Sequence, residues 1–477
     1  MAHSLSAARV VGPWFAPLAF WVLIAPLASS QVTVLEVGPG ATYTTIQSAI
    51  DAVVNGADTE IRVEQNLTYT ENLEVPATFD SGSLSILGGW DPTFTTQDPD
   101  PEHTVIDADA SGRAINILIE GGSFLLEGFT LTNGTRDGAG VRVFSNNVTN
   151  SAKVVLRSLW IVENHLTESP SAQGGGLYAL LRGTQRLEVL GSLIQGNTSS
   201  TWNQGNARGG GLFIHGRNNS TFLIDGCDIL ENSVDSDGGE RAGGGLYLFS
   251  EDDAKGVFYD TFVFENYVLG TGTSLGSGGY LRTSNAATLH VVRTGWAANE
   301  VIAGGATAQL VYTTEAGSHT FRMTDSGLAQ GDGGGLDVTT KDNGTVHLVN
   351  LTVADNPGTG IVATREGSST LAIYNTIAYG NGTDLTTSGT VDTGSNLIGV
   401  DPLFLDPLNL DYFLTAGSPA ENMGDNYPPG GLSPVDIENS SRVVDGIVDI
   451  GFAEGIDVIF ASNFETGDLT TWVDDSD

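Results

Sequence analysis

The feature that most constrains the fold is a Gly-rich step, followed by a short apolar run, that recurs through the middle of the chain. Its strongest copies read Gly-Gly-Gly-Leu and begin at Gly174, Gly209, Gly243 and Gly333. The first three are separated by 35 residues (174 to 209) and 34 residues (209 to 243). Self-similarity at such a period is typical of a repeat architecture, in which each copy stacks on the next.

Asparagines recur with the same period and form a second marker of the repeat. Most follow an apolar residue by three positions, as Asn232 follows Ile229. Stacking brings these asparagines above one another, so that their amides can hydrogen-bond along a ladder within the turn. The predicted ladder residues are Asn164, Asn197, Asn232, Asn266, Asn299, Asn356 and Asn381, with Gln330 expected to fill the gap after Asn299.

Apolar and polar residues alternate before these turns, as in segments 221–225 and 345–350. A period of two is the signature of a half-buried strand. Because the intervals are too short for helical crossovers, each strand has to pair with its equivalent one repeat away. We therefore expect an all-β fold, a right-handed parallel β-helix whose rungs contain about 25–36 residues and each add about 4.8 Å of length.

A solenoid needs its core covered at the ends, because open strand edges invite further pairing. Near the start, segment 43–54 has helical apolar spacing at Ile46, Ala49, Ile50 and Val53, and Asn55-Gly56 supplies a stop signal. A short capping helix is therefore expected over the first rung.

The first thirty residues have the features of a signal peptide. Arg9 is their charged residue, an apolar stretch spans 10–27, and small residues at 28–30 favour cleavage before Gln31. An uncleaved membrane anchor is the alternative, and no later segment has the apolar length of a transmembrane helix. We expect a protein that is secreted, either extracellular or at the cell surface.

The chain has 57 acidic and 19 basic residues, giving a formal charge of −38. Such a surface repels phosphate backbones, so nucleic acid is not an expected partner. The same charge keeps an exported protein soluble and favours a monomer. The sole cysteine, Cys227, lies in an apolar alternation and is expected to be a small buried filler.

Two resemblances support the fold. Segment 43–63, followed by Tyr69-Thr70-Glu71, resembles the entrance of pectate-lyase-like parallel β-helix proteins, and segment 87–94 is similar to one found in bacterial secreted β-helix proteins. Segments 396–399, 401–404, 417–420 and 448–451 resemble the choice-of-anchor Q domain. These resemblances imply an architecture and no single reaction.

The expected organisation is a signal peptide at 1–30, a capped β-helix at 31–395, C-terminal choice-of-anchor Q-like rungs with a cap at 396–455, and a tail at 456–477. The tail contains Phe464-Glu465-Thr466-Gly467-Asp468 and Trp472. It resembles a short element near the C-termini of some bacterial secreted proteins, which implies sorting or surface attachment. A simple terminal strand is the alternative.

Catalytic residues are hard to find in this sequence. The set that a polygalacturonase-type hydrolase needs is absent. A lyase needs carboxylates for Ca²⁺ and a basic residue near the substrate's α-proton. The weak candidates are Arg293, at a bend before Asn299, and His290 and His347, each nine residues before a ladder asparagine and expected two rungs apart on an outward face. Chance placement of histidines explains the last pair equally well.

Longer loops after the ladder turns are better candidates for binding, because loops on a rigid scaffold carry function. They span 198–208, 233–242 and 267–277, and the solenoid stacks them on one edge. Trp202 could stack on a sugar, and Asp235, Asp237 and Glu240 offer oxygen ligands for Ca²⁺. Plain solvation of acidic loops is the alternative.

Two functional hypotheses follow, with a purely structural envelope component as the remaining alternative. The first is a non-catalytic protein that binds a polysaccharide, a cell-surface glycan or another extracellular macromolecule, with no required cofactor and calcium as a candidate ligand. The second is a polysaccharide lyase or glycoside hydrolase of pectate-lyase-like fold. An outward cluster of Arg or Lys with two or three carboxylates would favour the enzyme.

Overall fold

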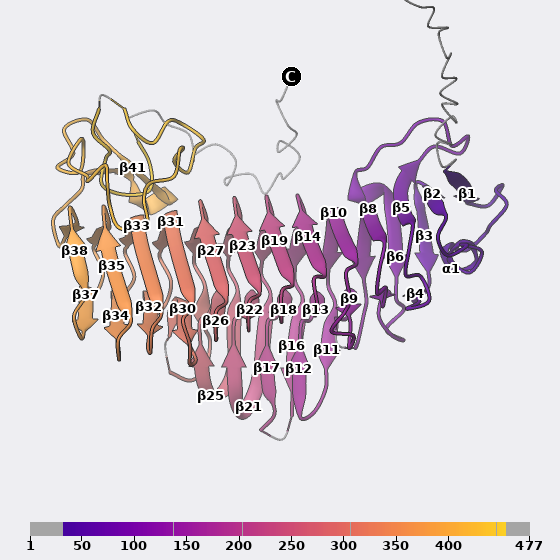
Figure 1. The fold of residues 1–477 in the computed structure, drawn as a ribbon, viewed down its shortest axis with the longest axis horizontal. Helices are drawn as coiled ribbons and strands as arrows, with labels where there is room; N and C mark the ends of the chain where they lie inside the picture. The colour runs from indigo at the N-terminus through magenta and orange to yellow at the C-terminus, as the bar shows by residue number, and fades with distance from the viewer. Residues whose placement is uncertain (1–31, 137, 203, 306, 445, 455–477) are drawn as a thin grey trace, which may run out of the picture. The chain divides into compact units, whose positions relative to one another are not determined.

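The computed structural model describes residues 32–454 apart from 137, 203, 306 and 445, and it is a right-handed parallel β-helix. Strands of three sheets stack in parallel register along the solenoid (Figure 1). The predicted fold class is confirmed. The predicted signal peptide and the tail at 456–477 lie outside the described residues. Among the described residues, no helix has the length and apolar character needed to cross a membrane.

Sheet A forms one wall of the solenoid, and most of its rungs bend into two legs. The first leg contains β1 (Thr33–Val37), β2 (Asp58–Glu64), β5 (Ser83–Trp90), β8 (Ser123–Thr132), β10 (Lys153–Val162), β14 (Arg186–Leu190), β19 (Thr221–Asp225), β23 (Lys255–Tyr259), β27 (Thr288–Val292), β31 (Thr320–Ala329), β33 (Thr345–Ala354), β35 (Thr370–Tyr374) and β38 (Asp392–Gly394). In β8, β10, β31 and β33, the same strand continues through the bend into the second leg. The second leg contains β3 (Leu67–Thr70), β6 (Thr104–Asp107), β15 (Leu193–Gln195), β20 (Asp228–Leu230), β24 (Phe262–Phe264), β28 (Gly295–Ala297), β36 (Ile377–Tyr379) and β39 (Leu397–Ile398).

Sheet B forms the opposite wall. It contains β4 (Leu73–Val75), β7 (Ile115–Ile117), β9 (Val141–Phe144), β13 (Leu177–Leu181), β18 (Leu212–Gly216), β22 (Leu246–Ser250), β26 (Gly279–Thr283), β30 (Ala308–Thr314), β32 (Gly334–Thr340), β34 (Thr359–Arg365) and β37 (Thr383–Ser388).

Sheet C projects from the solenoid where the sequence predicts long loops, and we call it the fin. Its strands are β11 (His165–Thr167), β12 (Ser171–Gln173), β16 (Thr198–Thr201), β17 (Asn206–Arg208), β21 (Ser233–Ala242), β25 (Tyr267–Leu275) and β29 (Glu300–Val301). The predicted stacking on one edge is confirmed, but the segments are paired strands rather than loops (Figure 1). Small apolar residues, such as Ala207 and Val234, fill the fin's interior.

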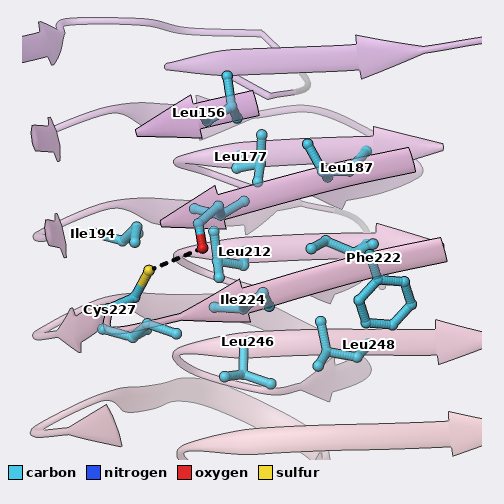
Figure 2. Close-up of a cluster of buried hydrophobic side chains, with 14 of the residues drawn as sticks. Leu156, Leu177, Leu187, Ile194, Leu212, Phe222, Ile224, Cys227, Leu246 and Leu248 are labelled. Atoms are coloured by element: carbon cyan, nitrogen blue, oxygen red, sulfur yellow. Dashed lines mark hydrogen bonds between the residues drawn. The ribbon is translucent and has the colours of Figure 1, made fainter. Parts of the chain in front are cut away.

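The solenoid core is filled from the inward positions of sheets A and B. In β19, Phe222 and Ile224 are buried while their neighbours are partly exposed, as the alternation predicts. Figure 2 shows such residues stacked in layers from successive rungs. Cys227 is one of them, and its thiol lies 3.5 Å from the carbonyl oxygen of Val189. Burial raises the pKa of this thiol to about 12, so Cys227 is the inert filler that the sequence predicts.

The asparagine ladder runs through the turn at the end of sheet A. Each amide donates to the side-chain oxygen of the next asparagine, at 2.9 Å from Asn164 to Asn197 and 2.9 Å from Asn197 to Asn232. The Asn232 amide also donates to the Ile194 carbonyl at 2.8 Å. The ladder amides therefore have hydrogen-bond partners, which is the condition for burying polar side chains such as Asn197 and Asn232.

The prediction that Gln330 continues the ladder is wrong. Strand register places Gly331, not Gln330, opposite Asn356. Gln309, from β30 of sheet B, reaches across instead and accepts from the Asn299 amide at 2.9 Å while donating to Asn356 Oδ1 at 2.9 Å. A Cβ at position 331 would lie 2.3 Å from the Gln309 side chain, so glycine makes the room. The Gln330 amide donates outward, to Pro407 O at 2.6 Å.

We expect Gln309→Ala to lower the free energy of unfolding by about 2–4 kcal/mol, because it removes one acceptor of the buried Asn299 amide and one donor to the buried Asn356 Oδ1 and opens a cavity. Urea unfolding with hydrogen exchange at rungs 295–300 and 353–357 measures the effect. Gln195→Ala is the matched control, since Gln195 bonds Glu231 at the surface. Equal losses in both variants would contradict the assignment of Gln309 to the ladder.

The two ends of the solenoid differ. At the N-terminal end, α1 (Ile46–Ile50) buries Ile46, Ala49 and Ile50, which confirms the predicted capping helix. The Glu71 carboxylate accepts from the amides of Ile46 and Gln47 at 2.8 and 2.9 Å and so satisfies the first helical donors.

The C-terminal module, residues 399–454, contains β40 (Phe404–Asp406), η2 (Pro407–Asn409) and β41 (Asp411–Leu414). The sequence predicts a cap over the last rung, but the module packs along the side of sheet A, over β31 to β36 (Figure 1). Its aromatic residues Phe413 and Phe452 pack there against small outward-facing residues of sheet A, among them Ala329 and Ala354. The last rung's Leu385, Val391 and Ile398 stay only partly buried.

Candidate functional site

The outer face of sheet B carries two rows of aromatic and basic side chains, which we call the aromatic strip. Outward positions of β9, β13, β18, β22 and β26 lie in register on consecutive rungs. Its members are Arg142, Phe144, Tyr178, Phe213, His215, Tyr247, Phe249, Tyr280 and Arg282. The rungs are close enough for rings at equivalent positions to stack.

The rings of the first row are stacked almost in parallel. Tyr178 and Phe213 have centroids 5.3 Å apart with planes 4° from parallel, and Phe213 and Tyr247 are 5.0 Å apart at 17°. Tyr280 continues the row 5.3 Å beyond Tyr247. The side of the row against the fin is covered by Ala242, Leu275 and Ala308. The middle rings are thus buried and rigid, while Tyr178 is partly exposed.

Guanidinium groups lie over rings of the second row, which contains Phe144, His215, Phe249 and Arg282. Arg282 lies 4.8 Å from the Phe249 centroid and donates to the Tyr247 hydroxyl at 2.9 Å, and it also pairs with Glu315. Arg142 lies 4.0 Å from the Phe144 centroid and donates to Asn116 Oδ1 at 3.3 Å. Among the described residues, no carboxylate lies at ion-pair distance from Arg142, and its side chain is partly exposed.

His215 adds a neutral ring to the second row. Its Nε2 lies 3.0 Å from Glu251, which also pairs with Arg217 at 2.6 Å, and its ring stacks on Phe249 at 4.5 Å. Burial lowers the pKa of His215 to about 4, against the opposing effect of Glu251. The imidazole is therefore uncharged at neutral pH.

The aromatic strip was missed by the sequence reasoning above, although a signal for it exists. An aromatic residue follows the inward leucine in three successive strong repeats, at Tyr178, Phe213 and Tyr247. A residue next to an inward position points outward, so the three rings must share one outer face.

The predicted loop residues lie on the fin and do not converge. Trp202 follows β16 and is 53% exposed. Asp235 and Asp237 share one face of β21; burial raises the pKa of Asp235, and Asp237 raises it further while Arg241 opposes the shift. Glu240 is engaged with Arg208 at 2.7 Å. Within the described part of the chain, no group of three or more His, Cys, Asp or Glu side chains is arranged to hold a metal ion.

The buried Arg241 holds the fin together from within. Its guanidinium donates to the carbonyls of Leu269, Gly272 and Ala303 at 3.0, 2.8 and 2.8 Å. These carbonyls belong to the next two rungs, so Arg241 fixes the fin's turns rather than facing a ligand.

The predicted His290 and His347 do lie two rungs apart on the outer face of sheet A, with Arg322 in register between them. Arg322 donates to Gly431 O of the C-terminal module at 2.8 Å. Burial lowers the pKa of both histidines, and Arg322 lowers it further. The module thus covers this row at His347, where a Cβ at Gly430 would lie 2.6 Å from the ring.

Arg293 lies at the bend of sheet A and is bound to a neighbour. It forms two bonds of 2.6 Å to Asp260 and stacks 4.3 Å from the Tyr259 centroid. Burial alone would lower the pKa of Arg293, but Asp260 raises it. A guanidinium held this way stays protonated and is poorly suited to act as a base.

Two carboxyl groups on the rung two before that of Arg293 have shifted pKa values. Burial raises the pKa of Asp225, and Asp260 raises it further while Arg293 opposes the shift. Burial also raises the pKa of Asp228, to about 6. Asp225, Asp260 and Arg293 together form the kind of outward cluster that would favour an enzyme.

Comparison with known proteins yields no family assignment. No family model matches this chain, and no curated protein matches it. Among solved structures, pectate lyase Pel9A is similar with a TM-score of 0.42 and 14% identity, over 89% of this chain and 97% of that one. The deglycosylated pectin methylesterase from Aspergillus niger follows with a TM-score of 0.29 and 15% identity, over 78% and 92%. Likeness at this level is limited to the β-helix arrangement.

Proposed function

We propose that this chain is a secreted, non-catalytic β-helix protein that binds an extracellular glycan along the aromatic strip of sheet B. The observation that carries the proposal is the register of rings and guanidinium groups on consecutive rungs. A glycan chain lying along the solenoid axis would meet a partly exposed ring or guanidinium on every rung, namely Phe144, Tyr178, His215, Phe249 and Arg282, whereas Phe213, Tyr247 and Tyr280 are buried and support them. The repeating sugar units of the glycan would then lie along the repeating rungs of the solenoid.

The chemistry of the strip suits sugars. The partly exposed rings of Phe144, Tyr178 and Phe249 present apolar surface to C–H groups, and Tyr178 adds a hydroxyl. Arginine presents a planar set of donors to hydroxyl or carboxylate oxygens. Because stacking holds the rings in place, little conformational entropy is lost on binding. The fin supplies an adjacent surface on which Trp202 is exposed.

The proposal includes the settings that the sequence predicts: export through residues 1–30, action outside the cell or at its surface, a monomeric state and no required cofactor. Calcium remains a candidate ligand of the acidic surface. Attachment through a choice-of-anchor Q-like segment at 396–455 is part of the same proposal.

A second candidate function is cleavage of a glycan at the bend of sheet A. The observation in its favour is that Asp225 and Asp228 lie on one rung on either side of the bend, where burial raises the pKa of Asp228 to about 6, a value suitable for a general acid near neutral pH. Against it, Arg293 and Asp260 are engaged with each other. This candidate therefore rests on Asp225 and Asp228 rather than on Arg293.

We expect Arg142→Ala to weaken glycan binding about tenfold, which corresponds to about 1.4 kcal/mol for one arginine's contacts. Affinity electrophoresis or calorimetry on a panel of neutral and acidic polysaccharides measures it. Arg186→Ala is the matched control, because Arg186 lies on sheet A and pairs with Glu188. Equal affinity in the Arg142→Ala variant and the unaltered protein would contradict the proposed face.

The same panel separates binding from catalysis. New reducing ends would indicate hydrolysis, and ultraviolet absorbance of unsaturated products would indicate elimination. Either activity, if abolished by Asp228→Asn, would replace the first proposal with the second. Binding without new ends or absorbance supports the non-catalytic protein.

A further inference from the structure

An apolar pocket lies between sheet A and the C-terminal module, on the side of the solenoid away from the aromatic strip. Its volume is about 60 Å³, several times what one water molecule needs and below the roughly 150 Å³ of a cavity that encloses benzene, so it takes part of an aromatic ring rather than a whole one. Phe262, Gly327 and Ala329 belong to its solenoid side, and Tyr412, Phe413 and Phe452 belong to its module side. The lining contains no charged residue. Water is poorly held in such a space, so the matching occupant is an apolar side chain.

Glycines keep this pocket open. The outward positions of β28 and β31 at the pocket are Gly295 and Gly327, which are in register. A Cβ at Gly327 would lie 3.7 Å from the Phe452 ring, at ordinary contact distance. Neither backbone conformation nor close packing therefore demands glycine at position 327. The effect of a glycine at position 327 is to leave space between sheet A and the C-terminal module.

The chain itself supplies a suitable occupant. Phe452 is part of the pocket wall, and two residues later Glu454 is buried and fixed by a 2.9 Å bond from its amide to Asp436. The sequence then continues for 23 residues, 455–477, with Phe460 as the first aromatic residue. Eight residues separate Phe452 from Phe460, and an extended chain of that length spans up to about 26 Å.

We propose that the C-terminal tail, residues 455–477, docks on its own molecule by inserting Phe460 into this pocket. The tether places the tail at an effective concentration in the millimolar range, so a tail contact with a dissociation constant of about 0.1 mM is sufficient for about tenfold protection. A second copy is a poorer source of the side chain, because each copy has a formal charge of −38 and repels the other. The proposal is independent of glycan binding.

Limited proteolysis of the tail in the full chain tests the proposal. We expect Phe460→Ala to speed cleavage within 461–477 at least tenfold, because cleavage follows the population of the undocked form. Gly327→Leu, which fills the pocket from the solenoid side, is expected to do the same. Trp472→Ala is the matched aromatic control and is expected to leave the rate unchanged. Phe460→Ala leaves the solenoid intact, so it remains informative if Gly327→Leu unfolds.

Three outcomes would overturn the proposal. The tail of the unaltered protein could be cleaved as fast as that of the Phe460→Ala variant. Trp472→Ala could release the tail while Phe460→Ala does not. Protection could also rise with protein concentration and track a dimer in sedimentation, which would assign the pocket to the tail of a second copy.

Discussion

Replacing Ile229 with aspartate is expected to remove more than about 4 kcal/mol from the stability of the rungs around it, the largest effect that we anticipate from one substitution. Ile229 is fully buried on β20 and lies in register between Ile194 and Val263. The substitution removes the apolar contacts of Ile229 and places a carboxyl group in the apolar core, away from hydrogen-bond donors. Neutralising the carboxyl by protonation does not restore the contacts.

The matched control is Leu230→Asp, one residue along the same strand. Leu230 faces outward between Gln195 and Phe264 and is partly exposed, so the new carboxylate reaches water. Its expected cost is about 1 kcal/mol or less. Urea unfolding followed by peptide-level hydrogen exchange distinguishes local from global loss, as repeat proteins often unfold in parts. Comparable stability of the two variants would contradict the inward assignment of Ile229.

Ile229 also illustrates what a sequence of this kind reveals. The alternation around it, and the asparagine three residues later, are local patterns repeated in many rungs, and repetition makes the inward face and the ladder readable. Stacking of the segments after the ladder follows from the same period. Their pairing into the fin was missed, because Gly, Ser and Asp suggest loops when each copy is considered alone.

Features that depend on contacts between two sheets were harder to predict from the sequence. Gln309 enters the ladder from sheet B, and the difference between Gly331 and Gln330 is one residue of register. The C-terminal module's position depends on small residues, such as Ala329 and Ala354, that face outward rather than inward. Only the paired strands show that these residues offer an apolar surface. The candidate site lies on a single sheet and was missed for a different reason: its members come from five separate strands, and only Tyr178, Phe213 and Tyr247 directly follow a Gly-Gly-Gly-Leu repeat.

A buried ionic cluster joins the C-terminal module to sheet A and makes that contact sensitive to pH. Arg442 of the module lies with its Nε 3.4 Å from Asp325 of β31 and 3.6 Å from Glu454, and all three side chains are almost fully buried. Burial raises the pKa of Glu454 from 4.5 to about 8, although Arg442 opposes the shift. Burial also raises the pKa of Asp325, again against Arg442.

We expect the module to be less stable at pH 9 than at pH 6. Because the folded pKa of Glu454 lies above its unfolded value, folding takes up a proton between them. The resulting stabilisation is complete below about pH 4.5 and is lost progressively as the pH rises to about 8. At about 1.4 kcal/mol per pKa unit, the loss over the whole range has an upper limit of about 5 kcal/mol. The raised pKa of Asp325 acts in the same direction.

Glu454→Gln tests the role of Glu454 in this pH dependence, because glutamine resembles the protonated acid. Its side-chain oxygen can still accept from the Asp449 backbone amide, which lies 2.8 Å from Glu454 Oε1 in the unaltered protein. Hydrogen exchange of segments 404–414 and 436–452, corrected for the intrinsic rate at each pH, measures the module's stability. The variant is expected to retain at pH 9 most of the protection that it has at pH 6. Glu421→Gln, at a partly exposed carboxylate of the same module, is expected to keep the pH dependence of the unaltered protein. If Glu454→Gln loses protection between pH 6 and 9 as steeply as Glu421→Gln, the titrating group is not Glu454.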